Sequence, residues 1–374
     1  MQHEELAGWL RLALTPGIGN GAARQLLAAF GLPSAVFAQP AAALQQLLGA
    51  AQAEALRQPP PGFDERLDQT WRWLQGTDTD GTTRRIVTLG DPGYPAALLE
   101  TADPPLMLHV LGHPAFDLTQ LERSLAVVGS RNPTPQGASN ARLFARALGD
   151  AGLVIVSGLA LGVDGAAHEG ALEAHGPGDA PATIAVVGTG LDRVYPARHR
   201  DLAHRIAARG LIVSEFLLGT PPLTQNFPKR NRIIAGLTRG TLVVEAALQS
   251  GSLITARLAA EQGREVFAIP GSIHSPQSRG CHALIRQGAK LVESVHDILE
   301  DLRLDAPAPA AAPADGPEES GLLPALGFDP VSLDALAART GHEVAALQAQ
   351  LLELELAGQV ARLPGGLFQR LGRA

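Results

Sequence analysis

The residues best suited to chemistry in this sequence are small residues, hydroxyls and one arginine that directly follow predicted strands. Small residues let a backbone approach an anion, hydroxyls and helix amides donate hydrogen bonds to it, and arginine adds a fixed positive charge. The segments concerned are Gly129-Ser130-Arg131, Ser157-Gly158 and Ser250-Gly251-Ser252. Each segment is a weak signal alone, but their joint occurrence favours a pocket for phosphate groups over plain strand–helix turns.

A basic segment adds a second part to this chemistry. It reads Asn226-Phe227-Pro228-Lys229-Arg230-Asn231-Arg232, and no acid lies between Thr220 and Arg239. Phe227 could stack on an unpaired base, which is worth about 1–3 kcal/mol per base. The alternative is a solvated helix start whose charges face water. An aromatic next to clustered cations, close to glycine-lined loops, favours a nucleic-acid site.

Net charge and cysteine content narrow the class of protein. The 374 residues carry a formal net charge of −7, so a nucleic-acid binder of this kind must concentrate its positive charge in one place. The single cysteine, Cys281, excludes an intramolecular disulfide and fits a reducing compartment. We find neither a leader-like N-terminus nor an apolar run long enough to span a membrane. These features predict a cytoplasmic protein.

Enzyme and cofactor signatures are missing. A Walker A loop needs Gly-Lys-Ser/Thr, but Lys229 and Lys290 follow proline and alanine. The closest approach to the dinucleotide pattern G-x-G-x-x-G, residues 188–193, lacks the last glycine. His109 and His113 are interpreted as two unrelated surface histidines, because no metal-binding spacing surrounds them. We therefore expect neither a metal nor a cofactor.

Three residues suggest a hydrolytic triad but also have a purely structural interpretation. Ser157, Asp164 and His168 could be imagined as nucleophile, orienter and base, but no G-x-S-x-G elbow surrounds the serine. The favoured interpretation makes Asp164 a helix N-cap and His168 a residue on the face of that helix. No catalytic residue is predicted.

The elements that must position these residues form an alternating pattern. Helical spacing dominates residues 4–56 and recurs near 63–74, whereas short β-branched runs alternate with helical segments from about Arg85 onward. This pattern predicts an α/β fold with a doubly wound, mostly parallel, Rossmann-like sheet, whose ligands sit beyond the carboxyl ends of the strands. Strands are expected at residues 85–89, 106–111, 125–128, 153–157, 183–187, 211–214, 242–245, 265–269 and 290–292.

Composition divides the chain further. Residues 1–80 are expected to form a helical domain that resembles a SAM or helix-hairpin-helix module. In it, Thr15-Pro16-Gly17-Ile18-Gly19 is either a phosphate-contacting hairpin or an ordinary helical turn. The sheet domain should span 81–302, and proline, alanine and acids over 303–320 indicate a linker. Residues 321–374 follow the helix–turn–helix–hairpin order of a winged helix. Its second long helix carries Glu343, Glu353 and Glu355 and no cation, which argues against insertion into a DNA groove.

Across Arg85–Leu299 the sequence closely resembles the DNA processing protein A (DprA/Smf) family. The stretches that carry the resemblance are, in the family's order, Val127–Arg131, Ser157–Asp164 with His168, Gly190–Asp192 with Tyr195 and Pro196, Ser214 with Glu215, Phe227–Leu237, Val244–Ala246, Ser250–Ala256 and Ile269–Gly271.

The resemblance implies a Rossmann-like domain that binds single-stranded DNA and forms a homodimer. It implies that the protein shields incoming strands from nucleases and helps load the RecA recombinase in natural transformation. By matching motif, Arg131 and Lys229–Arg232 would hold phosphates, while Ser157-Gly158 and Ser250-Gly251-Ser252 would supply amides and hydroxyls. Two alternatives stay open: a nucleotide-binding or nucleotide-processing protein on the same sheet, and a duplex-DNA regulator that uses the tail.

Overall fold

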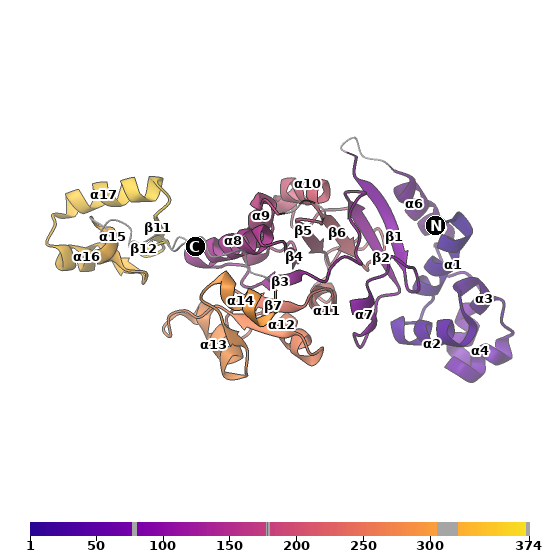
Figure 1. The fold of residues 1–374 in the computed structure, drawn as a ribbon. Coiled ribbons are helices and arrows are strands. Elements are labelled where there is room, and N and C mark those ends of the chain that lie inside the picture. The colour runs from indigo at the N-terminus through magenta and orange to yellow at the C-terminus, as the bar shows by residue number, and fades with distance from the viewer. Residues whose placement is uncertain (77–80, 177, 179, 305–320, 372–374) are drawn as a thin grey trace.

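The computed structural model describes residues 1–76, 81–176, 178, 180–304 and 321–371. Its centre is a nine-stranded sheet with the order β1-β2-β6-β5-β4-β3-β7-β8-β9 (Figure 1). β1–β2 and β2–β6 pair antiparallel, and every other pair in this sheet is parallel. The strands are β1 (Thr83–Thr88), β2 (Met107–Gly112), β3 (Ser124–Val128), β4 (Val154–Ser157), β5 (Thr183–Val186), β6 (Leu211–Ser214), β7 (Gly240–Val243), β8 (Glu265–Ala268) and β9 (Lys290–Leu291).

Strand β3 shows why both faces of this sheet must be covered. All five of its residues are buried. Because successive side chains of a strand point to opposite faces, Leu125 and Val127 pack into one core cluster, whereas Ala126 and Val128 pack into another. Burying a leucine or valine side chain contributes roughly 1.5–3 kcal/mol. A strand of this kind therefore belongs in the middle of a helix-covered sheet, as the sequence predicted.

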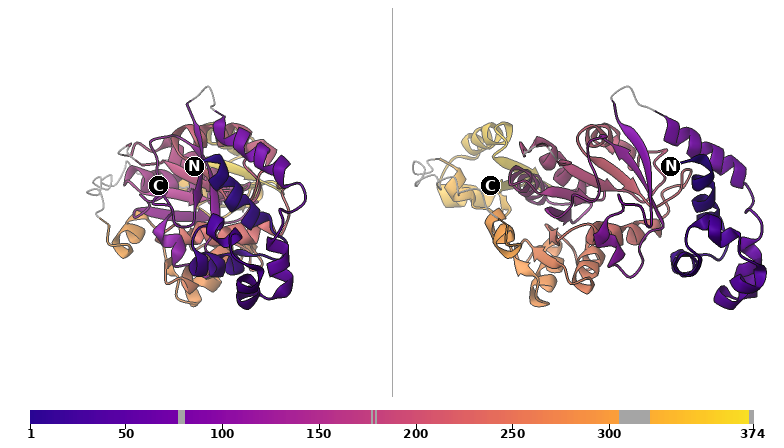
Figure 2. Two further views of the ribbon diagram at one scale, coloured as in Figure 1. Left: turned by 90° about the vertical axis from the view of Figure 1, so that its right-hand side faces the viewer. Right: turned by 45° about the vertical axis from the view of Figure 1, so that its right-hand side comes forward.

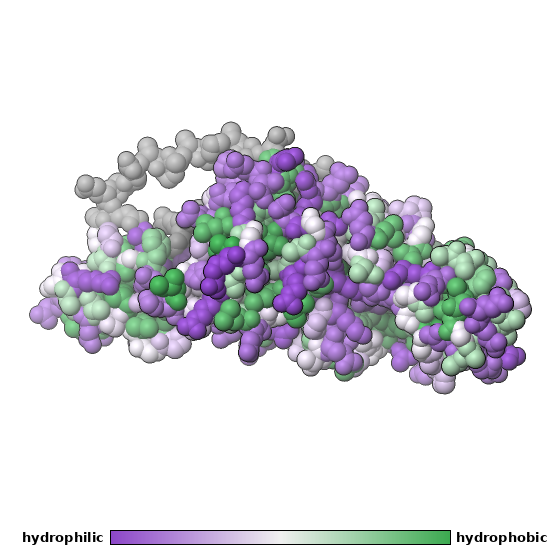
Figure 3. Space-filling view, turned by 90° about the horizontal axis from the view of Figure 1, so that it is seen from below, coloured by the Kyte–Doolittle hydropathy of each residue, from purple (hydrophilic) through white to green (hydrophobic). Residues whose placement is uncertain are grey.

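Two groups of helices cover the two faces. The cluster on one face includes side chains from α8 (Pro135–Asp150), α9 (Val163–Glu173) and α14 (Val295–Asp301), and α10 (Arg200–Arg209) follows the short helix η1 (Ala197–His199) on the same side. The other face is covered by α7 (Ala96–Leu99), α11 (Asn226–Gly236), α12 (Ser252–Glu261) and α13 (Arg279–Arg286), the last preceded by η2 (Pro276–Ser278). In Figure 3, which looks onto the side of α12 and α13, hydrophilic and apolar residues are interspersed.

The N-terminal helices pack on the antiparallel edge of the sheet (Figure 2). Ile86, Leu106 and Met107 join the same core cluster as Leu6, Trp9 and other apolar side chains of these helices. The helical region and the sheet thus share buried surface at β1 and β2. The helices are α1 (His3–Leu14), α2 (Asn20–Phe30), α3 (Pro33–Phe37), α4 (Ala41–Leu48), α5 (Ala50–Leu56) and α6 (Phe63–Gln75).

The C-terminal module contains a three-stranded sheet of order β10-β12-β11 beside three helices. Leu336, Leu347, Leu351 and Phe368 are among the residues that form its own core. The elements are α15 (Leu323–Leu326), β10 (Val331–Ser332), α16 (Leu333–Thr340), α17 (Val344–Leu356), β11 (Val360–Leu363) and β12 (Leu367–Arg370). The predicted fold class, including the winged-helix tail, is confirmed. The predicted linker lies largely outside the described residues.

Local geometry corrects two side-chain assignments. Asp164 is not an N-cap, because α9 begins at Val163 and its N-cap is Gly162. His109 is not at the surface: it is fully buried, its ring lies 5.8 Å from that of Trp73, and burial lowers the pKa of His109 to about 4. It points from β2 into the core shared with the N-terminal helices.

Candidate nucleic-acid interface

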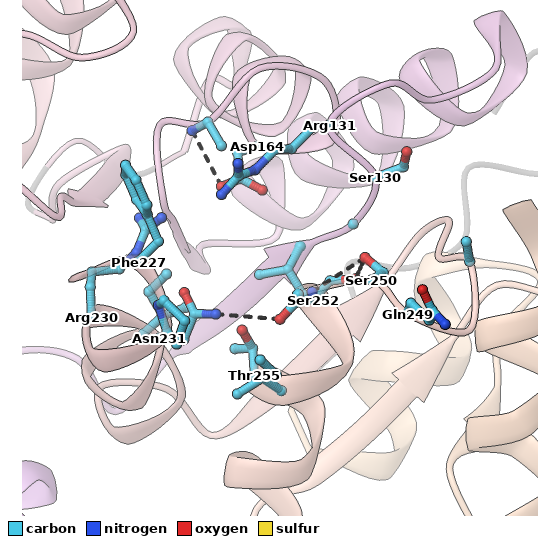
Figure 4. Close-up of a pocket in the computed structure, with 18 of the residues that line it drawn as sticks. Ser130, Arg131, Asp164, Phe227, Arg230, Asn231, Gln249, Ser250, Ser252 and Thr255 are labelled. Atoms are coloured by element: carbon cyan, nitrogen blue, oxygen red, sulfur yellow. Dashed lines mark hydrogen bonds between the residues drawn. The ribbon is translucent and has the colours of Figure 1, made fainter. Parts of the chain in front are cut away.

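A cleft of about 700 Å³ opens at the carboxyl ends of β3 and β7. These two parallel strands are neighbours, but the chain continues from β3 to β4 on one side and from β7 to β8 on the other. This is the switch point of the sheet, where the following loops diverge and leave a crevice for a ligand. Figure 4 shows the loop after β3, the start of α11 and the loop before α12 surrounding the cleft.

The loop after β3 is held against β7. A Cβ on Gly129 would stand 2.7 Å from Cγ2 of Val163, so only glycine fits there. The Ser130 amide donates to the Glu245 carbonyl at 2.7 Å, and the Glu245 carboxylate accepts hydrogen bonds from the amide and hydroxyl of Thr134. Both ends of the loop are therefore fixed relative to β7.

Arg131 is the exposed cation of this fixed loop. Its guanidinium carbon lies 5.3 Å from the centre of the Phe227 ring, across the cleft in Figure 4. A guanidinium at this distance from an aromatic face is attracted to it. The structure thus brings the predicted arginine and the predicted aromatic together.

Helix periodicity divides the basic segment between two faces of α11. Phe227, Arg230 and Asn231 are three and four residues apart and line the cleft. Arg232 lies on the other side of the helix, where it pairs with Glu215 and, at 3.4 Å, with Asp103. It does not reach the cleft, so the prediction that Arg232 contacts phosphates there is wrong. Lys229 is exposed and does not line the cleft, because it lies three residues before Arg232 on the same side of α11, where its charge acts on Glu215.

Arg230 forms a buried positive charge in the cleft floor. It is 4% exposed, and its Nη1 donates to the Val186 carbonyl. Burial lowers the pKa of Arg230 to about 10, so the guanidinium stays charged at neutral pH. Burial also raises the pKa of Asp164, an effect opposed by the charge of Arg230 and by hydrogen bonds from the amides of Gly158 and Ala160.

Ser157 and Gly158 shape the floor and do not line the cleft. Ser157 is fully buried, and its Oγ donates to the Val127 carbonyl at 2.6 Å. The prediction that this hydroxyl faces a phosphate is therefore wrong. A Cβ on Gly158 would collide with the Arg230 guanidinium, which explains why the position must be glycine. Gly158 therefore leaves the space that the Arg230 side chain fills.

The loop before α12 forms the opposite wall. The hydroxyls of Ser250 and Ser252 lie 2.7 Å apart, and the Asn231 side chain donates to the Gly251 carbonyl at 3.4 Å. This contact joins the α11 wall to the α12 wall. All three predicted residues of this loop line the cleft.

Sequence reasoning missed several lining residues. Tyr195 is 46% exposed, and its ring centre lies 5.7 Å from that of Phe227, so the cleft has two neighbouring aromatic side chains. Tyr195 is one of only two tyrosines in the chain, which was a usable signal. The other missed residues with polar or charged side chains are Asn132, Asp164, Thr224, Gln249, Thr255 and Gln277.

The arrangement of Ser157, Asp164 and His168 does not form a hydrolytic site. His168 is fully buried and its Nδ1 lies 2.7 Å from the Thr183 hydroxyl, whereas the Ser157 hydroxyl is bound to a carbonyl, so the two do not form a nucleophile–base pair. Within the described ranges, no group of three histidine, cysteine or acidic side chains could hold a metal ion. No helix in the same ranges is long and apolar enough to cross a bilayer.

Comparison with known proteins places the chain in a family. The model of the DNA recombination-mediator protein A family matches residues 85–303, and that of the DprA winged helix domain matches 306–366. Protein Smf of Escherichia coli (strain K12) is 47% identical over 293 residues, which are 75% of this chain and 76% of that protein. DNA processing protein DprA of Streptococcus pneumoniae is 49% identical over 211 residues, which are 56% of this chain and 72% of that protein.

Two solved structures of similar proteins agree with this family assignment. DNA processing protein A from Streptococcus pneumoniae superposes with a TM-score of 0.64 at 36% identity, covering 80% of this chain and 98% of that one. The structure of the protein of the same name from Helicobacter pylori concerns its single-stranded DNA binding mode. It superposes with a TM-score of 0.52 at 32% identity and covers 59% of this chain and 96% of that one. The sheet with its cleft at the switch point, the winged helix and these relatives together show that the chain belongs to the DprA/Smf family of DNA recombination mediators.

Proposed function

We propose that this recombination mediator binds single-stranded DNA in the cleft between β3, α11 and α12, without reading its sequence. The observation that carries the proposal is the meeting of Arg131 and Phe227 across the cleft, above the buried charge of Arg230. Guanidinium groups attract phosphates of any sequence, and every base has a face that can stack on Phe227 or Tyr195. Lys229, an exposed cation on α11, adds a phosphate contact beside the cleft.

In this proposal the protein acts in the cytoplasm as a homodimer and is not an enzyme. It protects incoming strands during natural transformation and helps load RecA on them. Support comes from the family and from the Helicobacter pylori relative, whose structure concerns single-stranded DNA. The proposal also divides the chain into a helical region (1–80), the sheet domain (81–302), a linker (303–320) and the winged helix (321–374). The central unit needs its N-terminal helices, because these share a core with β1 and β2.

The tail is expected to be dispensable for binding to single strands. Ending the chain at Leu304, which packs against the core of the sheet domain, removes α17, which carries acids and no cation. We expect affinity for an oligothymidylate to stay within about twofold of the full chain, since like charges do not hold phosphates. Fluorescence anisotropy at several salt concentrations measures this.

The same titration separates the alternatives. A duplex-DNA regulator that uses the tail would lose binding on truncation and would favour duplex over single strands. A nucleotide-binding protein would bind a free mononucleotide at micromolar concentration and saturate, and calorimetry would detect it. Either result, with weak binding of the oligothymidylate, would contradict the proposed function.

A further inference from the structure

A second cleft, of about 650 Å³, lies between α10 and the β1–β2 edge of the sheet. Its apolar lining comes from side chains that include Leu111, Ala203, Ala207 and Ile212. Ala203, Ala207 and Ile212 also belong to the core cluster under α10, with Leu111 packed against it. This floor is thus a rigid part of the fold, although the cleft plays no part in the site described above.

The sides of this second cleft are basic. Arg84, Arg193, Arg200 and His204 line it, and Asp192 is its one acid, so the described lining carries a positive balance on a chain of net charge −7. Arg193 is paired with Asp192 at 2.8 Å. Arg200 and His204 are exposed one turn apart on α10, and neither forms an ion pair within the described part of the chain. Cations beside an apolar floor suit a ligand that has phosphates on one side and flat apolar groups on the other.

One loop joins the two clefts. Tyr195 lines the first cleft, whereas Arg193, Val194 and Ala197 line the second. Consecutive Cα atoms are about 3.8 Å apart, so the boundary between the clefts is only the width of this loop. The loop is fixed, because the Gly219 amide donates to the Asp192 carboxylate at 2.8 Å and the His199 ring contacts the Leu159 carbonyl at 3.0 Å.

We propose that the second cleft binds the continuation of the same single strand, which passes over Tyr195 and runs along α10 with its phosphates toward Arg193, Arg200 and His204. The inference rests on the proposed function of the first cleft. An extended acidic peptide would also meet these cations. The strand is favoured because the loop that contributes an aromatic ring to the first cleft contributes an arginine to the second.

The test compares two oligothymidylates on the full-length chain, one of about 6 and one of about 16 nucleotides, within the usual range of single-strand site sizes. The variant is Arg200→Glu, because glutamate suits the first turn of a helix and should leave α10 intact. The matched control is Arg146→Glu on α8, an exposed arginine that lines neither cleft. We expect Arg200→Glu to weaken binding of the longer strand roughly tenfold and to flatten its salt dependence by about 0.7 in logarithmic slope.

The shorter strand should bind Arg200→Glu and wild type equally, and Arg146→Glu should bind both strands as wild type does. An unchanged affinity of Arg200→Glu for the longer strand would overturn the inference. An acidic peptide would then be the better occupant of the second cleft, and the cleft of a second protomer would account for any advantage of length. If wild type binds neither oligonucleotide, the proposed function itself fails. The two failures are therefore distinguishable.

Discussion

The double substitution Arg131→Ala/Lys229→Ala is expected to weaken binding of single-stranded DNA roughly a hundredfold. Arg131 lines the first cleft, and Lys229 is an exposed cation on α11, the helix that forms one wall of the cleft. A hydrogen bond to a charged group is worth about 1.5–3 kcal/mol, and two losses at the lower end of this range together change the dissociation constant roughly a hundredfold. Loss of two phosphate contacts should also reduce the logarithmic salt slope by about 1.4. Anisotropy titrations across salt measure both quantities.

The matched control for this experiment is Arg146→Ala/Arg72→Ala. Both arginines are exposed and lie outside the cleft, so this variant changes the net charge by the same amount. Equal losses in the two double variants would mean that overall charge, and not the cleft, governs binding. Circular dichroism and an unchanged unfolding midpoint would show that the fold is intact in each variant.

Arg230→Met is expected to lower the free energy of unfolding by about 3 kcal/mol, because it removes the cation with the larger effect on the buried carboxyl of Asp164. The substitution removes the positive charge that opposes the effect of burial on Asp164, and it removes the donor to the Val186 carbonyl. Denaturant unfolding measures the loss. Adding Asp164→Asn should recover about 1 kcal/mol or more, since asparagine keeps an acceptor for the amides of Gly158 and Ala160 without the charge.

The loss of unfolding free energy in Arg230→Met, called the deficit below, should increase as the pH rises. The pKa of Asp164 is raised by burial above its ordinary 3.8, so its contribution to stability is complete below that value and is lost as pH rises through the folded-state pKa. Without Arg230 the folded-state pKa rises further. The deficit should be smallest near about pH 4 and grow toward neutral pH. A deficit under about 1 kcal/mol at neutral pH would show that Arg230 does not stabilise the buried carboxyl.

Much of the fold followed from the sequence, because the signals were local. Each of the nine strands of the main sheet overlaps a segment expected from its apolar run, and β3, with five buried residues, could only be a central strand. Arg131 and Ser250–Ser252 were predicted to approach each other because loops after parallel strands meet at one edge of the sheet. The cleft contains them all.

The errors came from information that a sequence does not carry. Ser157 ends a strand buried on both faces, so alternation could not tell which way its hydroxyl points. Helix periodicity separates Arg230 from Arg232, but only the packing of α11 on the sheet decides which of them faces the cleft. Tyr195 reaches the cleft through a loop whose path depends on a contact between Asp192 and the distant Gly219. Each of these outcomes is set by tertiary contacts.

Photo-cross-linking of an oligothymidylate carrying 5-bromouracil tests the central claim most directly. Bases that stack on Phe227 and Tyr195 should cross-link to the peptides that contain these residues, and Phe227→Leu should remove its own cross-link while the Tyr195 peptide stays labelled. Cross-links confined to α17 or to the N-terminal helices, with none at Tyr195 or Phe227, would contradict the account.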